Sequence, residues 1–369
     1  MSQTSYCAST AAVNRVLKTI PIKESRTKTV EILDGPHSSG LNVPGASGRS
    51  TTYGYRSWYR FNGATTKREA MRILLTGGTG LIGSALCRKW TSEGHEVIVW
   101  SRQPSTVAAL CSGAAAIGHL QELHDAKPLD AVVNLAGAPI ADSPWTQSRR
   151  AVLLESRVNL TRTLVDWLAT LPQRPRVLIS GSAVGWYGNG QDAILDEGSA
   201  PQKPDFGSTL CGSWEHEAMR AQSLGIRVVL LRTAAVFSPV GGMLARLRLP
   251  FRLGLGGRLG SGQQWMPWIH IADQVGLIDF LLHHEGCEGP VNACAPQMVR
   301  NVEFTVALAR ALHRPAFLPM PAAVLKLVLG EMSNLLLEGQ RVRPSRALEL
   351  GYPYKFAQID TALADVMGP

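Results

Sequence analysis

The sequence predicts an α/β protein with a doubly wound parallel sheet of the Rossmann type and a smaller C-terminal region of substrate-binding segments and helices. Short apolar runs that fit buried strands alternate with helical patterns from residue 71 onward. The first apolar run, "RILLT", leads into the glycine-rich turn "GGTGLIG" and then into a helical pattern. The composition, 45% apolar and 18% charged, is typical of a globular chain long enough to bury a sizeable core.

Residues 1–70 differ from the rest of the chain. They contain 18 Ser or Thr residues and no sustained helical or strand pattern, so we expect a disordered extension. Two interpretations stay open: a dispensable tail ahead of a native start at Met71, or a segment that targets an organelle. This extension holds ten of the 37 Lys and Arg residues and four of the 28 acids. The remaining 27 cations and 24 acids nearly balance, which argues against nucleic-acid binding.

Two further classes of protein are excluded by the sequence. No run approaches the roughly 18 apolar residues of a membrane-spanning helix, so we expect no integral membrane segment. The six cysteines form no C-x-x-C pair and the histidines show no ligand spacing, so we predict no metal site.

Scattered cysteines are typical of reduced thiols. They indicate a cytoplasmic protein, or one of an organelle stroma or matrix if residues 1–70 are a transit peptide.

The glycine-rich turn predicts a dinucleotide site. Gly77, Gly80 and Gly83 have the spacing G-x-x-G-x-x-G between an apolar strand over 73–75 and a helix that we expect to end near Ser92. Glycine permits the tight turn, lets the backbone approach a pyrophosphate and lets the helix pack closely on the strand. The start of the helix then offers N–H groups and the positive end of its dipole to the phosphates.

The residues after the second strand, "EVIVW", indicate which dinucleotide binds. A site for NAD usually places Asp or Glu here to accept hydrogen bonds from the ribose hydroxyls. This chain has Ser101 and Arg102 instead. A hydroxyl and a guanidinium suit a 2′-phosphate, which an arginine can hold with two hydrogen bonds. We therefore predict NADP(H) as the cofactor.

The later elements follow the same α/β order. A strand over 131–140 presents Leu135 and Ala136 at its carboxyl end, where the crevice of an open sheet binds ligand. The next helix has Arg157 near its start and an apolar stripe of Leu154, Val158, Thr161, Val165 and Leu168. Strands are predicted over 176–180 and 227–238, and helices over 303–312 and 322–337. We expect the last of these to be a buried helix or helix pair.

Four sequence blocks resemble a known family. "SGSAVGWYG", "DFGSTLCGSWE", "PFRLGLGGRLGSGQQWMPWIHIAD" and "LLLEGQRVRPSRALELGYPY" look like atypical members of the extended short-chain dehydrogenase/reductase family, the epimerase-family proteins with a C-terminal helical module. The resemblance implies an NADP-binding domain over 71–300, a helical module over 301–369 and no firmly assigned substrate. It also implies cofactor contacts at the matching positions, which are Gly77, Thr79, Gly80, Leu81, Ile82, Gly83, Ser101, Arg102, Leu135, Ala136 and Arg157.

The catalytic signature of that family is incomplete in this chain. Ser182 stands where a typical extended member has the serine that hydrogen-bonds the substrate oxygen. Counting from Ser182, the family's tyrosine position falls near Gly207 and its lysine position at Cys211. Glycine has no proton to transfer and a neutral thiol supplies no cation. Tyr187 is the candidate substitute for the proton donor, and a buried acid (Asp205 or Glu215) or water stays open.

Basic and aromatic residues predict the substrate side of the site. Positive charge is concentrated among glycines at Arg246, Arg248, Arg252 and Arg258, which favours an anionic substrate, with a solvated basic face as the alternative. Gln264, Trp268 and His270 would suit a polar, ring-shaped ligand, although Trp268 fits the core equally well.

These patterns predict an NADP(H)-binding atypical short-chain dehydrogenase/reductase that transfers hydride, as an oxidoreductase or in an epimerase-like reaction. Its substrate is an unidentified small molecule, anionic or sugar-like. The alternative is a non-catalytic NADP(H)-binding regulatory or scaffolding protein of the organelle or cell division type. A sugar-nucleotide epimerase of ordinary mechanism would need the tyrosine that this chain lacks. Extended members often pair through the two long helices after their fourth and fifth strands, so a homodimer is the assembly we expect.

Overall fold

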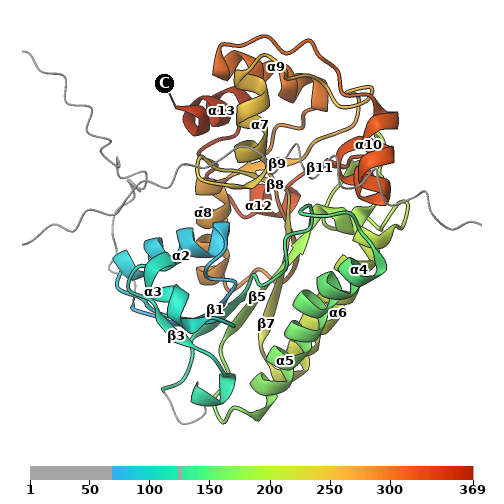
Figure 1. Cartoon of the computed structure of the whole chain (residues 1–369). Coiled ribbons are helices and arrows are strands. Elements are labelled where there is room, and N and C mark those ends of the chain that lie inside the picture. Colours follow the sequence, from blue (N-terminus) through green and yellow to red (C-terminus); the bar gives the residue numbers. More distant parts are fainter. Residues whose placement is uncertain (1–68, 124–126, 369) are drawn as a thin grey trace, which may run out of the picture. The chain divides into compact units, whose positions relative to one another are not determined.

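A seven-stranded parallel sheet lies at the centre of the protein (Figure 1). The computed structural model describes residues 69–123 and 127–368, and its strand order is β10-β7-β5-β4-β1-β2-β3. The predicted doubly wound α/β fold is therefore confirmed. The order reverses on either side of β1, and in such sheets ligands bind beyond the carboxyl ends of the strands at that point. The strands are β1 (Arg72–Thr76), β2 (Glu96–Trp100), β3 (Ala115–Ile117), β4 (Ala131–Asn134), β5 (Val177–Ala183), β7 (Arg227–Thr233) and β10 (Gly289–Ala293).

Helices cover both faces of this sheet. On one face lie α2 (Leu81–Ser92), the short α3 (Val107–Leu110) and α8 (Ile271–His283), and on the other lie α5 (Leu160–Thr170) and α6 (Phe206–Met219) (Figure 1). Successive side chains of a strand point to opposite faces, so each strand contributes to both layers of core. In β1, Ile73 and Leu75 pack under α2, whereas Leu74 packs on the side of α5. Both faces are buried, which explains why these strands read as continuous apolar runs.

The predicted strands are longer than the observed ones at two places. The strand over 131–140 ends at Asn134, and a loop carries the remaining residues outward. The strand over 227–238 is divided into β7 and β8 (Ala235–Phe237). β8 leaves the main sheet and pairs with β9 (Trp268–His270), so that this segment joins the sheet to the C-terminal region.

The helix after β4 contains a π-helical segment. α4 (Gln147–Leu154) continues through π-helical residues Glu155–Asn159 into α5. A π-turn has one residue more than an α-turn and shifts the positions that face the core. Leu153 is therefore fully buried and Leu154 is 37% exposed, so the predicted place of Leu154 in the buried stripe was wrong. Segments of this kind frequently occur at functional sites, and this one carries Arg157.

The C-terminal region has a second core around Phe237, Trp268 and Phe304. Its connection to the sheet domain includes the buried carboxylate of Asp273 on α8, which accepts hydrogen bonds from the backbone N–H groups of Lys355 and Phe356, both at 2.8 Å. The elements of this region are α7 (Gly242–Arg252), α9 (Asn301–Leu312), α10 (Ala322–Leu329), α11 (Asn334–Leu337), α12 (Ser345–Glu349), α13 (Ile359–Met367) and the short strands β6 (Ile194–Leu195) and β11 (Arg341–Val342), which pair with each other.

The segment predicted as a buried helix is the clearest departure from expectation. It forms two helices, α10 and α11, as one of the predicted forms, but no residue of either helix is buried, and Leu327 is 87% exposed; only Met332 and Ser333 between them are buried. Apolar content alone predicted burial, whereas burial requires a partner surface that the monomer does not supply. Within residues 69–123 and 127–368, none of the helices is both long and apolar enough to span a bilayer. The extension predicted for residues 1–70 lies outside the described residues except for Glu69 and Ala70.

Candidate cofactor and catalytic site

The glycine turn between β1 and α2 brings the backbone close to the end of β4. Gly77 has a φ of +69°, and a Cβ there would lie 2.7 Å from the carbonyl atoms of Leu135. A Cβ on Gly83 would lie 2.2 Å from the Gly77 carbonyl oxygen, so only glycine lets α2 approach the strand this closely. Thr79 and Gly80 are exposed, and Leu81 and Ile82 are half-buried in the first turn of α2. The start of α2 is thus open to a ligand phosphate.

A buried chain of hydrogen bonds fixes the strand ends around this turn. The Thr76 hydroxyl donates to the Asn134 side-chain oxygen at 2.7 Å and accepts from the backbone N–H of Ala136 at 3.0 Å. The Asn134 amide donates to the Thr161 hydroxyl at 2.8 Å, and so does the Trp214 indole at 2.9 Å. These hydrogen bonds hold together four elements, β1, β4, α5 and α6. They place Leu135 and Ala136 beside the glycine turn.

Ser101 and Arg102 follow β2 at the same edge of the sheet. Thr76 of β1 pairs with Trp100 of β2, so both strands end in register and the residues after them are neighbours. Arg102 is exposed, and within the described part of the chain its guanidinium makes no hydrogen bond or ion pair. The Ser101 hydroxyl accepts from the backbone N–H of Gln103 at 3.1 Å. Residues 101–110, which follow β2, therefore include a cation and no acid.

Arg157 points from the π-helical segment toward the loop after β4. Its guanidinium donates to the Ala138 carbonyl at 2.9 Å and lies 5.4 Å from the centre of the Trp214 ring. A Cβ on Gly137 would meet that guanidinium at 2.9 Å, which shows how closely the loop passes. Burial lowers the pKa of Arg157 because the charged form loses hydration. No carboxylate is among the groups that influence this pKa, so the cation is available to an anionic ligand.

Ser182 lies at the end of β5 beside a buried ion pair that the sequence did not predict. Its hydroxyl donates to the Glu215 carboxylate at 2.6 Å. Arg232 of β7 holds the same carboxylate with two hydrogen bonds, both 2.9 Å long. The exposed fractions of these three residues are 5%, 7% and 3%. Ser182 and Arg232 are paired residues of adjacent parallel strands, which directs both side chains to the face covered by α6.

Tyr187 lies on the far side of Arg232 from Glu215. Its hydroxyl is 2.7 Å from the Asn292 side-chain oxygen and 3.2 Å from a guanidinium nitrogen of Arg232. Burial raises the pKa of Tyr187 to about 12, an effect that Arg232 and Asn292 only partly oppose. The Arg232 guanidinium also stacks on Trp186, 3.5 Å from the ring centre. Because its hydroxyl is tied into the interior, we do not carry Tyr187 forward as the proton donor.

Comparison with known proteins places this arrangement in a family. Residues 73–294 match the NAD dependent epimerase/dehydratase family. The chain belongs to this family. Residues 320–366 also match a domain of unknown function, DUF1731. The mouse epimerase family protein SDR39U1 is 38% identical over 301 residues, which cover 80% of this chain and 100% of the mouse protein. The epimerase family protein YfhF of Bacillus subtilis is 34% identical over 80% of this chain and 98% of its own length.

Solved structures support the assignment of this chain to the epimerase/dehydratase family. The crystal structure of human SDR39U1 (isoform2) with NADPH aligns with a TM-score of 0.74 at 37% identity, over 80% of this chain and 99% of the human one. The nucleoside-diphosphate sugar epimerase of Corynebacterium glutamicum aligns with a TM-score of 0.66 at 30% identity, over 81% of this chain and 59% of its own. UDP-glucuronic acid 4-epimerase of Bacillus cereus, at 18% identity over 80% and 99% of the two chains and a TM-score of 0.65, shows the shared fold.

In this family member, the position expected for lysine is occupied by a neutral thiol. Cys211 is 6% exposed, and burial raises its pKa to about 12, with the nearby Glu215 adding to the rise. At neutral pH it is neither a cation nor a thiolate. Asp205 caps α6, because its carboxylate accepts from the backbone N–H of Ser208 at 2.7 Å. Of the acids considered from the sequence, only Glu215 lies at Ser182.

The residues predicted to line the substrate side have structural partners. Trp268 is 1% exposed and stacks on Phe237 in the second core. The Gln264 amide donates to the backbone carbonyls of Leu259 and Leu336. His270 is 3% exposed, its Nδ1 accepts from the first turn of α8, and burial lowers its pKa to about 4. These contacts give the three residues packing and capping roles, and we do not propose them as substrate ligands.

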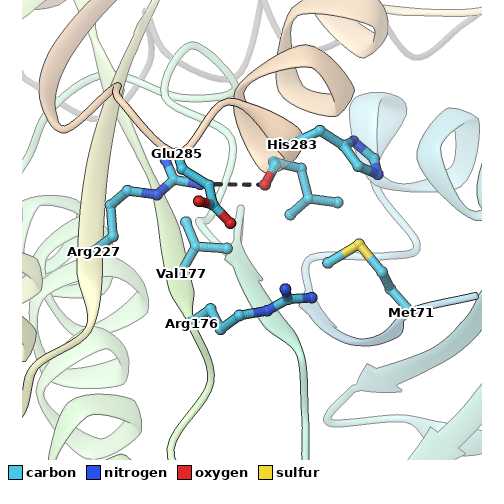
Figure 2. A pocket seen from close by; sticks show the side chains of 7 residues that line it. Met71, Arg176, Val177, Arg227, His283 and Glu285 are labelled. Atoms are coloured by element: carbon cyan, nitrogen blue, oxygen red, sulfur yellow. Dashed lines mark hydrogen bonds between the residues drawn. The ribbon is translucent and has the colours of Figure 1, made fainter. Parts of the chain in front are cut away.

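A pocket lies at the opposite end of the sheet from Ser182. Its volume is about 290 Å³, and Met71, Val177 and Arg227 at the amino ends of β1, β5 and β7 line it (Figure 2). The Arg227 guanidinium reaches the last turn of α8, where it donates to the Leu282 carbonyl at 3.2 Å. Ligands of open α/β sheets bind at the carboxyl edge, so this pocket is not part of the candidate site. No described group of His, Cys, Asp and Glu residues has the arrangement of a metal site.

Arg232 and Asn292 are the residues that sequence reasoning missed. Arg232 interrupts the apolar run "RVVLLRT", and a charge inside a buried strand needs a partner of opposite charge. That interruption was the available signal for a buried ion pair. It did not identify Glu215 as the partner, because the two residues come from different elements.

Proposed function

We propose that this chain is an NADP(H)-dependent oxidoreductase that transfers hydride at a carbinol or carbonyl carbon of a small substrate, alone or within an epimerase-like reaction. The observation that carries this proposal is the Ser182–Glu215–Arg232 cluster at the end of β5, on the edge that also holds the glycine turn. A cofactor turn and a proton-transferring group on one sheet edge are the two parts that hydride transfer at an alcohol requires.

NADP(H) is the cofactor that the residues present fit best. The open start of α2, with exposed Thr79 and Gly80, suits the pyrophosphate. Arg102 and Ser101 suit the 2′-phosphate, since residues 101–110, which follow β2 in the chain, include no acid. Arg157 places an uncompensated cation beside the loop of Leu135 and Ala136, within reach of the phosphates or the nicotinamide ribose. The human relative crystallised with NADPH supports the same assignment.

The cofactor, when bound, supplies or accepts the hydride, and the chain must move the proton. Ser182 gives its only O–H proton to Glu215, so its oxygen can take part in a further hydrogen bond only as an acceptor. A substrate hydroxyl that donates to Ser182 Oγ can pass its proton to Ser182 as the serine proton moves to Glu215. The carboxylic acid formed at Glu215 would later return its proton to solvent. Arg232 holds the carboxylate in place for this transfer.

This route replaces the tyrosine and lysine of typical extended members. There, a cationic lysine lowers the pKa of the tyrosine that transfers the proton, according to the family resemblance. Here an anion beside the serine does the corresponding work, with a fixed guanidinium as its counter-charge. Positioned acid–base groups of this kind contribute about 10²- to 10⁴-fold to the rate.

A screen for turnover tests the proposal. NADPH oxidation is recorded against carbonyl compounds and NADP⁺ reduction against alcohols and sugar nucleotides, for the wild type and for Ser182→Ala and Glu215→Gln. We expect losses of about 10²-fold or more in kcat for both variants and little change in the Kd for NADPH. Glu217→Gln on the same helix is the matched control, since Glu217 pairs with Arg162 and Arg220 rather than with Ser182, and its rate should stay near that of the wild type. Turnover that survives in Ser182→Ala would exclude this mechanism.

The second candidate is a non-catalytic NADP(H)-binding regulatory or scaffolding protein. The glycine at position 207 and the cysteine at position 211 favour it, because both residues of the usual catalytic pair are absent. This function predicts tight NADPH binding with no oxidation on any compound of the screen. It also predicts that Ser182→Ala leaves every property of the protein except stability unchanged.

We also propose the domain limits 71–300 and 301–369, a homodimer and a cytoplasmic location. The family match over 73–294 and the DUF1731 match over 320–366 support the first of these. Light scattering with NADPH measures the assembly, and fractionation of the source cells measures the compartment.

A further inference from the structure

Large apolar side chains are exposed along two segments of the C-terminal region. Their exposed fractions range from 43% at Met320 to 87% at Leu327. Folded chains rarely expose contiguous apolar surface of this kind without a use for it. We name this set the apolar face; it consists of Leu249, Leu253, Leu255, Phe317, Leu318, Met320, Val324, Leu327 and Val328.

The two segments that carry the apolar face lie side by side over residues 256–260 and 318–320. The backbone N–H of Leu318 donates to the Gly256 carbonyl at 3.2 Å, and that of Met320 donates to the Arg258 carbonyl at 2.9 Å. The N–H of Gly260 returns a bond to the Met320 carbonyl at 2.9 Å. A Cβ on Gly257 would lie 1.9 Å from the Leu318 oxygen, so the packing between the segments is close. This pairing leads directly into α10, on which Val324, Leu327 and Val328 are exposed.

The charged residues within the two segments of the apolar face have one sign. Residues 247–260 and 313–329 contain five Lys or Arg residues and neither Asp nor Glu. Arg252, Arg258, Arg314 and Lys326 are exposed, and Arg248 is half-buried. None of the five forms an ion pair with another residue of the described ranges 69–123 and 127–368. The face therefore combines protruding apolar side chains with uncompensated positive charge.

We propose that the apolar face docks on an anionic phospholipid bilayer. Apolar side chains would enter the boundary between headgroups and acyl chains, while the arginines and Lys326 meet lipid phosphates. Phe317 and Leu253, at 71% and 64% exposure, protrude enough to insert in this way. An isolated eight-residue helix such as α10 has little stability in water, and the lipid boundary supplies the surface that its exposed side chains lack.

A second copy of the chain fits the same face less well. An isologous contact would place the five cations of one copy against the same five of the other, with no acid in these segments to separate them. A bilayer rich in anionic headgroups is complementary in charge and adapts its shape to protruding side chains.

Vesicle flotation of the full chain tests this proposal. The vesicles are phosphatidylcholine alone, or phosphatidylcholine with about one third phosphatidylglycerol. The wild type should float with the anionic vesicles only, and added salt should weaken this binding. Leu253→Glu/Phe317→Glu and Leu327→Glu should each reduce the bound fraction by about fivefold or more, because each places a carboxylate at the lipid boundary.

Val306→Glu on α9 is the matched control. Val306 is 52% exposed and lies outside the apolar face, so the same change of charge there should leave flotation within about twofold of the wild type. Circular dichroism and NADPH binding confirm that each variant is folded. Wild-type flotation that the face variants do not reduce would assign binding to another part of the chain, such as basic residues 1–70, and overturn the proposal. Absence of flotation, or a dimer that the face variants dissociate, would overturn it as well.

Discussion

Glu215→Gln should destabilise the protein by about 3 kcal/mol, because it leaves the buried Arg232 guanidinium without its counter-charge. Glu215 is 7% and Arg232 3% exposed, so water screens their interaction only slightly. The carboxylate accepts both guanidinium hydrogen bonds at 2.9 Å and the Ser182 hydroxyl at 2.6 Å. Glutamine keeps the shape and one oxygen but turns an amide N–H group toward a second donor. One hydrogen bond is therefore lost together with the charge.

The same helix offers a matched control. Glu217, two residues along α6, pairs with Arg162 and Arg220, whose side chains are 51% and 42% exposed. Removal of a carboxylate from partially solvated partners should cost only about 1 kcal/mol or less. The assay is urea unfolding followed by circular dichroism, with midpoints compared at equal slope. If Glu215→Gln costs no more than Glu217→Gln, the buried ion pair is not the stabilising unit we describe.

A double variant separates the pair from its surroundings. Glu215→Gln/Arg232→Gln replaces two opposite charges by two amides that can hydrogen-bond to each other. The double variant should lose less unfolding free energy than the sum of the losses of the two single variants, by about 2 kcal/mol. Simple additivity would indicate that each side chain acts through other neighbours.

Four other changes test separate parts of the structure. Arg102→Ala should weaken NADP⁺ binding by about 10- to 100-fold and NAD⁺ binding little, since one charged contact is lost; equal losses in titration calorimetry would exclude the 2′-phosphate role. Gly83→Ala should abolish NADPH binding and lower the urea midpoint, because its Cβ would lie 2.2 Å from the Gly77 oxygen. Tyr187→Phe should reduce stability by about 1–3 kcal/mol and leave the pH profile of turnover unchanged; a new profile would make Tyr187 catalytic. Burial holds the pKa of His270 near 4 against an ordinary value of 6.5, so the stability it contributes is present above pH 6.5 and lost as the pH falls through 4. The urea midpoint of His270→Asn should fall less over that window than the midpoint of the wild type.

Local sequence was sufficient to predict the glycine turn between β1 and α2. The turn from Gly77 to Gly83 needs glycine for reasons that lie within a few residues, and a strand and a helix flank it in the chain. The alternation of apolar strands and helices likewise predicted the sheet, because each strand must be buried on both faces. These features depend on short-range geometry, which a sequence displays directly.

The cluster around Ser182 depends on contacts between distant segments. Ser182 and Glu215, which form a hydrogen bond, are 33 residues apart in the sequence. Tyr187 and Asn292, which also form one, are 105 residues apart. The packing and register of these segments determine which residues come into contact. The residue pattern of one segment does not indicate which residue of another segment will lie beside it. The exposure of α10 could not be predicted for the same reason, since apolar content does not reveal whether a partner surface exists.

The neutral thiol at position 211 limits how the site can be redesigned. Cys211 is buried and lies close enough to Arg157 and Glu215 for both to influence its pKa. A lysine grafted there would become a third cation, with Arg157 and Arg232, around the single carboxylate of Glu215. A lysine at position 211 would therefore leave more positive than negative charge around Glu215. Its introduction would require a change of the neighbouring charges at the same time.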